Sequence, residues 1–177
     1  AAGAGTMAYF SDTESSSGNT VQAGTLALDF DSSGSFAFST VLAPTKTTTD
    51  SVTLVSNGSL AGSLDVDVSY TESDGSDNGQ DVTAQQLAEN LEVQRLEYGG
   101  ADVTGQISGG SPPTLHELAT NDHGSGETTQ NDLINLADPG SGTVFTVGFR
   151  LKDVGNDFQG DGIDITFEFN LNQDDTQ

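Results

Sequence analysis

The segment His116-Glu117-Leu118-Ala119-Thr120 begins like the zinc-protease helix motif H-E-x-x-H. In that motif two histidines lie one helical turn apart and bind the metal, and the glutamate acts as general base. Thr120 stands where the second histidine is required, and His123 lies seven residues after His116. Because Asn121-Asp122 ends a helix before that distance is reached, we interpret the two histidines as surface residues and not as a metal site.

A second group of residues could bind calcium. Asp74, Ser76 and Asn78 occupy the first, third and fifth positions of the calcium-loop pattern D-x-[DN]-x-[DN]-G. Gln85 occupies the twelfth position, where the pattern requires a bidentate glutamate. The segment fits either a calcium site or a solvated acidic turn that joins a strand to a helix, and we favour the turn.

One N-glycosylation sequon is present, Asn57-Gly58-Ser59. Asn-Gly is also a preferred dipeptide of two-residue β-hairpin turns, so the same residues fit a purely structural role. Asn57 is therefore a candidate glycan acceptor and a candidate turn residue.

The excess of carboxylates is the strongest signal in the composition. The 177 residues include 27 Asp and Glu against 4 Lys and Arg, which gives a formal net charge of −23. Repulsion at this density opposes a compact fold in dilute buffer, whereas in molar salt the Debye length falls to about 3 Å. We therefore interpret the charge as adaptation to brine. A nucleic-acid partner is excluded, because phosphate binding requires clusters of Lys and Arg.

Several further classes of function find no support. The chain has no cysteine, which excludes disulfides and thiolate metal sites. No nucleophile, base and orienting group form a recognisable set, so the sequence predicts neither an enzyme nor a cofactor, calcium aside. No apolar run approaches the roughly 20 residues of a membrane helix. Small residues at positions 1–5 are typical of signal-peptide processing sites, so we expect a mature, secreted, extracellular chain.

The elements that carry these residues are predicted to be mostly strands. Apolar and polar residues alternate, as in strands with one buried face, at residues 25–30, 62–70, 143–151 and 162–171. We expect the last two segments to form the core pair. Shorter strand candidates are residues 36–41, 52–56 and 91–98.

Two short segments predict helical turns in loops. Residues 83–90 follow Asp81, a possible N-cap, and residues 113–119 start at a proline pair. Together the patterns predict an all-β protein, a jelly-roll-like β-sandwich of about seven or eight strands. We expect residues 20–177 to form one domain and residues 1–19 to form an N-terminal donor strand with its tether.

Four stretches of the chain resemble the TasA and camelysin family. Residues 5–14 (GTMAYFSDTE) and 23–28 (AGTLAL) resemble its N-terminus, residues 55–61 (VSNGSLA) its strand turn, and residues 156–173 its closing strand. The family includes biofilm-fibre proteins of bacteria and bundling pili of archaea, with a jelly-roll fold and polymerisation by donor-strand exchange. Some members are described as metalloproteases. With the acidic composition, the resemblance implies a haloarchaeal-type pilus or matrix-fibre subunit.

The N-terminal residues fit that mechanism by their own chemistry. Thr6, Met7, Ala8, Tyr9 and Phe10 form a short apolar segment, and the polar residues 11–19 after it predict a flexible tether. At the sheet edge of another copy this strand would gain main-chain hydrogen bonds and bury Met7, Tyr9 or Phe10. Such head-to-tail addition yields a fibre. The alternative is that residues 4–10 form the first strand of their own domain.

Two hypotheses of function follow. The favoured one is a structural subunit of an extracellular filament, a pilus or biofilm-matrix fibre, which binds other copies of itself and supports adhesion. The alternative is a secreted calcium-binding or adhesive surface module, which would need carboxylate ligands within residues 74–85. A secreted metalloprotease ranks third, because it would need two or three histidine ligands at fixed spacing.

Overall fold

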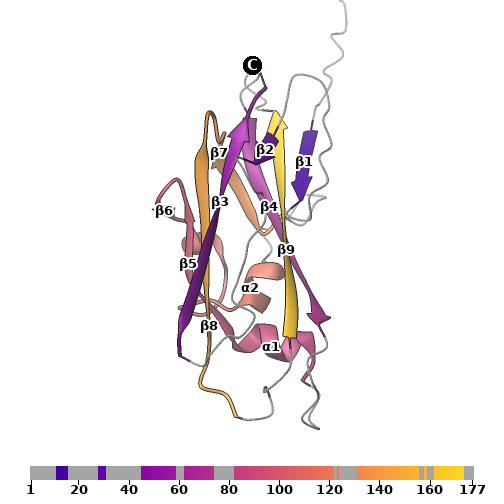
Figure 1. Cartoon of the computed structure of the whole chain (residues 1–177), viewed down its shortest axis with the longest axis vertical. Helices are drawn as coiled ribbons and strands as arrows, with labels where there is room; N and C mark the ends of the chain where they lie inside the picture. Colours follow the sequence, from indigo (N-terminus) through magenta and orange to yellow (C-terminus); the bar gives the residue numbers. More distant parts are fainter. Residues whose placement is uncertain are drawn as a thin grey trace, which may run out of the picture.

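Two antiparallel sheets pack face to face in the computed structural model (Figure 1). The structure describes residues 11–15, 28–30, 45–58, 62–73, 82–121, 123, 131–155, 158 and 162–173. One sheet has four strands in the order β1-β9-β4-β7, and the other has five in the order β2-β3-β8-β5-β6. The predicted all-β sandwich is confirmed.

The strands differ widely in length. The four-stranded sheet contains β1 (Ser11–Ser15), β9 (Gly162–Gln173), β4 (Gly62–Ser73) and β7 (Leu133–Ala137). The five-stranded sheet contains β2 (Leu28–Phe30), β3 (Thr47–Ser56), β8 (Thr143–Leu151), β5 (Leu91–Tyr98) and β6 (Ala101–Asp102). The connections carry α1 (Ala84–Asn90), the 3-10 turn η1 (Thr104–Gln106) and α2 (Leu115–Ala119).

The chain crosses repeatedly between the two sheets. From β3 onward, β4, β7 and β9 belong to one sheet, and β3, β5, β6 and β8 belong to the other. Several strands that are neighbours within a sheet, such as β4 and β9, are therefore distant in the sequence. Two antiparallel sheets that pack face to face in this way form a β-sandwich.

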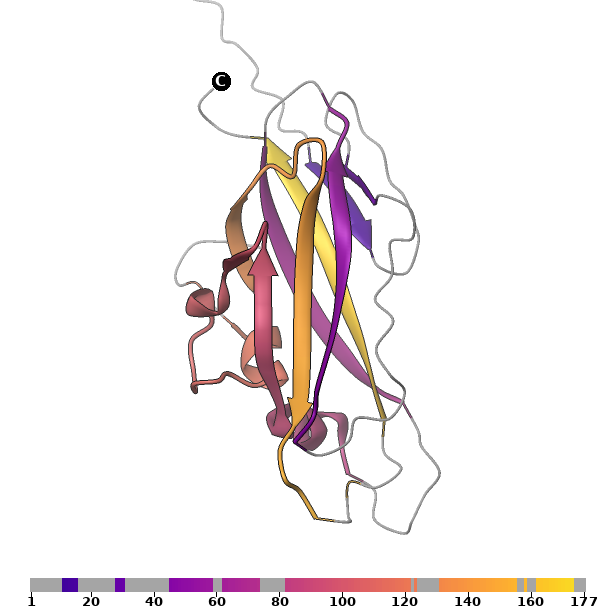
Figure 2. The same ribbon diagram turned by 60° about the vertical axis from the view of Figure 1, so that its left-hand side comes forward.

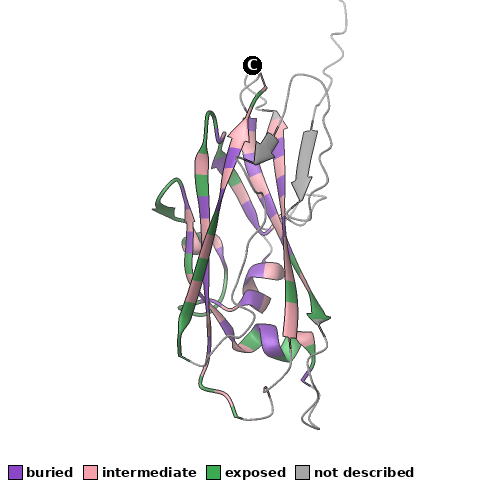
Figure 3. Cartoon of the chain, viewed as in Figure 1, coloured by how far each residue is buried: buried purple, intermediate pink, exposed green. Residues whose placement is uncertain are grey.

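The core lies where the inward side chains of the two sheets meet. Phe145 of β8 packs edge-to-face on Phe167 and Phe169 of β9, with ring centroids 5.8 and 5.2 Å apart. Figure 3 shows buried residues alternating with partly exposed ones along the strands. The two C-terminal segments expected to be the core pair do meet there. They meet by packing across the sandwich, because β8 and β9 belong to different sheets.

Both helices lie near the end of the sandwich where β9 begins (Figure 1). Each starts at a capping box, in which a threonine side chain accepts from the backbone three residues on and that residue's side chain binds the threonine N–H. Thr83 caps α1, so the predicted cap Asp81 is wrong. Thr114 caps α2, which begins at Leu115 and not at the proline pair. The buried residues Leu87 and Leu115 anchor the two helices to the core.

Some strands differ from the prediction. Residues 11–15, expected to belong to a flexible tether, form β1, which pairs antiparallel with β9 from Ser11 opposite Asn172 to Ser15 opposite Glu168. β3 starts five residues before the predicted strand, and β7 was not predicted. The expected strand at residues 36–41 and the expected donor strand at residues 6–10 lie outside the described residues.

Candidate functional site

The residues of the partial zinc motif are engaged in holding α2 in place. The Tyr70 hydroxyl on β4 and the Nδ1 atom of His116 are hydrogen-bonded at 2.7 Å. The Glu117 carboxylate accepts hydrogen bonds from the backbone N–H groups of Thr114 at 2.7 Å and Gly110 at 2.9 Å. Thr120 Oγ1 donates to the His116 carbonyl at 2.6 Å. Each side chain of the motif thus serves the capping or docking of this helix.

The electrostatics of Glu117 match this structural role. Burial acts to raise the pKa of Glu117, but the donors from Thr114 and Gly110 outweigh it and hold the pKa below its usual range. Gly109, with φ of +150°, lies against this carboxylate, and a Cβ there would collide with it. A general base works best with a pKa near the operating pH, so Glu117 is poorly suited to that task.

The two histidines have different partners. His123 Nε2 lies 2.8 Å from the Asp132 carbonyl oxygen and 3.2 Å from Asn121 Nδ2, whereas His116 is bound to Tyr70. Within the described part of the chain, no group of three or more His, Asp or Glu side chains is arranged to hold a metal ion. The structure therefore does not assemble the histidines into a pair.

A buried carboxyl group, Asp132, was missed by the sequence analysis. It lies just before β7 with 1% of its surface exposed. Its N–H donates to the Val66 carbonyl at 2.8 Å, and its Oδ2 accepts from Val68 N at 2.5 Å. Burial, with the adjacent Asp67 carboxyl group acting in the same direction, raises the pKa of Asp132 to about 8. A pKa of about 8 means that Asp132 holds its proton at neutral pH.

A buried amide links the backbone of Asp132 to the loop that follows η1. Asn121 Nδ2 donates to the carbonyls of Asp132 at 2.7 Å and Gln106 at 2.9 Å, and its Oδ1 accepts from Ser108 N at 3.0 Å. The Gln106 side chain in turn donates to the Ile134 carbonyl and accepts from the Ile134 N–H. It thereby provides hydrogen-bond partners for the backbone at the edge of β7. No motif in the sequence signals this network, because its members are separated by many residues and meet only in the folded chain.

Two predicted sites are located as follows. Asp74, Ser76 and Asn78 of the candidate calcium loop lie outside the described residues. Gln85, at the twelfth loop position, is exposed on α1 and donates to Glu89 at 2.8 Å. Asn57 is exposed directly after β3. Because β3 and β4 belong to different sheets, Asn57-Gly58 lies in a crossover, and the two-residue hairpin is wrong.

The edge of the four-stranded sheet is a second candidate site. β4 pairs with β9 along all of residues 162–173, whereas β1 pairs with β9 only at residues 168–172 (Figure 1). For residues 162–166 the described chain provides a strand partner on one side only. Ile163 and Ile165 point inward here and are half-buried, whereas Phe169 and Leu171, beside β1, are buried. The core is therefore less completely covered at this end of β9.

Comparison with known proteins agrees with the resemblance seen in the sequence. A family model described as camelysin metallo-endopeptidase matches residues 1–177. No curated protein matches the chain. No helix in the described residues is long and apolar enough to cross a membrane. Because the match extends over the whole sequence, the chain belongs to the TasA and camelysin family.

Proposed function

We propose that this protein is a structural subunit of an extracellular filament, a pilus or biofilm-matrix fibre, whose copies join head to tail by donor-strand complementation. Membership of the TasA and camelysin family supports a fibre-type subunit. The observation that carries the mechanism is that, among the described residues, β1 lies beside β9 at residues 168–172 only. An incompletely paired strand next to half-buried isoleucines is a suitable acceptor for an added strand.

The direction of β1 supports a donor strand that leaves the sandwich at the end of β9. Ser11 pairs with Asn172, one residue before the end of β9, and each step back along the chain from Ser11 is a step forward along β9. Only Gln173 of β9 lies beyond the partner of Ser11, so residues 6–10 would extend past the end of the strand. A second copy stacked on that end would offer the opposite end of its own β9, residues 162–166.

The lengths and side chains are compatible with such a junction. Thr6–Phe10 is five residues long, as is the segment 162–166. In an antiparallel register that places Phe10 opposite Gly162, Tyr9 faces Ile163 and Met7 faces Ile165. Facing residues share one side of a sheet, so Tyr9 and Met7 would cover the half-buried isoleucines of the next copy. Residues 6–15 would then form one strand shared by two subunits. Asp12 and Glu14 pair with the inward Leu171 and Phe169, so the cores of the two subunits would lie on opposite sides of this strand.

We further propose that the chain is not a peptidase, although its family model carries that description. The supporting observation is that Glu117 and His116 are engaged by Thr114 and Tyr70. Purified protein is expected to show no zinc-dependent cleavage of peptides. Zinc-dependent activity that disappears in His116→Ala, with the variant still folded, would show the opposite.

The filament proposal is tested by deleting residues 1–10. The truncated chain keeps all the described strands, so it should remain folded and monomeric, and electron microscopy should show no filaments. A synthetic peptide of residues 1–14 should bind this truncated chain, because strand addition depends on main-chain pairing and side-chain pockets. The Tyr9→Asp peptide should bind more weakly, because Tyr9 faces Ile163 in this register. Filaments of normal appearance from the truncated chain would rule out the N-terminal donor strand.

A further inference from the structure

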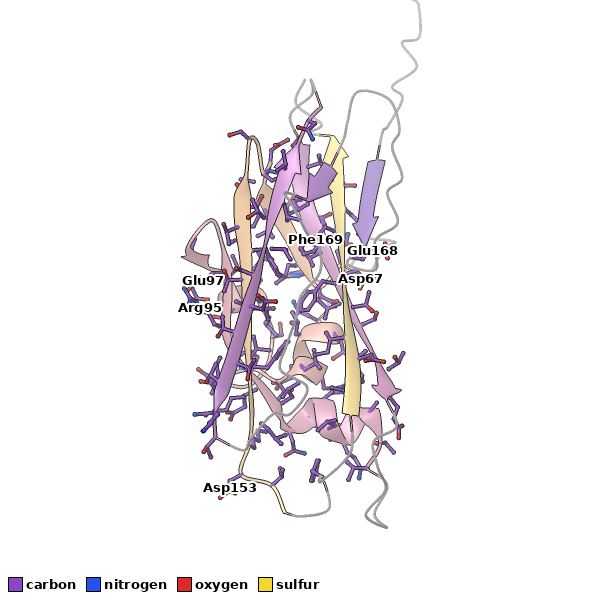
Figure 4. All side chains as sticks on the ribbon, in the orientation of Figure 1. Asp67, Arg95, Glu97, Asp153, Glu168 and Phe169 are labelled. Atoms are coloured by element: carbon purple, nitrogen blue, oxygen red, sulfur yellow. The ribbon has the colours of Figure 1, made fainter. Side chains whose placement is uncertain are left out.

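Charge is distributed unequally between the two outer faces of the sandwich. The outward positions of the four-stranded sheet carry Asp67, Asp164 and Glu168, and no Lys or Arg lies in the described strands of that sheet. Figure 4 shows Asp67 and Glu168 on one side of the molecule and Arg95 and Glu97 on the other. All four basic residues of the chain lie in the five-stranded sheet or directly beside its strands.

The outer face of β3, β8 and β5 is rich in hydroxyl groups, and we call it the threonine face. On β3 it consists of Thr47, Thr49, Ser51 and Thr53, which alternate with inward residues. Antiparallel pairing places the outward residues of β8, from Val144 to Arg150, beside them. The outward residues of β5, from Glu92 to Glu97, follow on the other side of β8. Figure 2 shows this sheet in front, with β8 between β3 and β5.

The charges on the threonine face are paired within it. Arg150 Nη2 lies 2.6 Å from Glu92 Oε2, and Arg95 Nη2 lies 2.8 Å from Glu97 Oε2. These two ion pairs contain all the outward charges of the three strands, so the threonine face has no net charge. Asp102 lies at the margin of this sheet on β6 and accepts hydrogen bonds from Thr104.

The threonine face has no gap at its centre, and several of its side chains are exposed to solvent. At its centre, a Cβ on Gly148 would lie 2.6 Å from Thr49 Oγ1 and 3.2 Å from Arg95 Cβ, so these two side chains close over the glycine. Thr49 and Ser51 are exposed. Val144 on this face is 44% exposed, more than any other large apolar side chain in the described residues.

We propose that the threonine face is the surface through which copies of this chain in neighbouring filaments associate side by side. This inference rests on the proposed filament function. Two copies that each carry −23 repel one another, and the outer face of the four-stranded sheet would bring further carboxylates together. Two threonine faces can meet without this electrostatic repulsion. Their hydroxyl groups and paired charges can then form hydrogen bonds across the contact.

The small area of the threonine face fits a multivalent contact, in which many weak contacts act together. Three strands about 4.8 Å apart, with outward residues spanning about 20 Å, present only roughly 200 Å². A stable pairing of two proteins buries about 800 Å² per partner, so one threonine face binds weakly. Many copies along a filament act together, and their combined strength can exceed that of one contact by several orders of magnitude. Filaments would therefore associate while free subunits stay separate.

Matched double variants test this surface. Thr49→Asp with Ser51→Asp adds two carboxylates to the threonine face, and Ser69→Asp with Thr71→Asp adds two to outward, exposed positions of β4. Electron microscopy of intact chains in molar salt would score the fraction of filament length in side-by-side contact. We expect the first pair to reduce this fraction at least about tenfold, because like charges would then oppose one another. The β4 pair should leave it near the wild-type value.

The outcomes separate this inference from the filament proposal. The threonine face would be ruled out as the contact surface if both pairs of substitutions reduced the fraction of side-by-side contact equally. It would also be ruled out if neither pair reduced that fraction. If the wild-type chain forms no filaments, the proposed function fails instead. Sedimentation velocity of the concentrated chain then tests the surface directly. Weak self-association that is lost in the β3 pair and kept in the β4 pair would support the threonine face. Any other result would rule it out.

Discussion

At the scale of single residues, Asp132 gives the molecule a defined response to pH. Its pKa rises from the ordinary value of 3.8 to about 8 in the folded chain, mainly through burial. A carboxyl group with a raised pKa binds its proton more tightly when folded, so its stabilising contribution is complete below about pH 4. This contribution is then lost as the pH increases toward 8. Ionisation would place a second negative charge beside Asp67 and weaken the junction between β4 and β7.

Substitution of Asp132 by Asn should remove this response. Asparagine retains an acceptor for Val68 N and can donate to Asp67, as the protonated acid does, but it does not titrate. The free energy of unfolding of the wild type, relative to Asp132→Asn, should fall by about 2–4 kcal/mol between pH 4 and pH 9. Denaturant titrations in molar salt at several pH values would measure it. Parallel curves for the two proteins would contradict the raised pKa of Asp132.

At the scale of the elements, the shared strand makes a prediction about register. The chain has no cysteine, so introduced pairs report on a single contact. Tyr9→Cys with Ile163→Cys should give disulfide-linked ladders in oxidised filaments, because the register places the two side chains on the same side of the sheet. Ala8→Cys with Ile163→Cys should link far less, because residue 8 points to the other face. Denaturing electrophoresis without reductant would compare them, and equal linking would rule out this register.

The long strands could be predicted from the sequence because their inward residues alternate with outward ones. β4, β5, β8 and β9 all show this pattern, and the fold class followed from it. β1 and the first half of β3 could not be predicted, because runs such as Thr47-Thr48-Thr49-Asp50-Ser51 have no apolar alternation and depend on pairing with β9 or β8. Whether such segments form strands depends on cross-strand partners that are distant in the sequence.

The candidate site was only partly accessible to the same reasoning. The failure of the zinc motif was visible at Thr120, and the structure adds the partners of His116 and Glu117. The network of Asp132, Asn121 and Gln106 depends on a β-bulge, where residues 134 and 135 of β7 oppose Asp65 alone. Neither the bulge nor the loop contacts leave a periodic pattern in the sequence.

At the scale of the whole molecule, net charge sets the dependence of stability on salt. In about 0.1 M salt the carboxylates act over roughly 10 Å, whereas in molar salt they act over about 3 Å. We expect the thermal midpoint to rise by about 10 °C or more between these conditions, since folding concentrates a net charge of −23. Calorimetry with sodium chloride would measure it, with sucrose as a control for exclusion effects. Equal midpoints would contradict adaptation to brine.

The antiparallel pairing of β1 with β9 also has a mechanical consequence. Both strands run along the long axis of the sandwich (Figure 1), and in the proposed filament the same strand continues into the next subunit. Tension along the filament would then pull the shared strand parallel to its neighbours and load all its inter-strand hydrogen bonds at once, in shear. Bonds loaded together resist far more force than bonds opened one after another from an end. A filament of this design would be strong under pulling although no covalent bond joins its subunits.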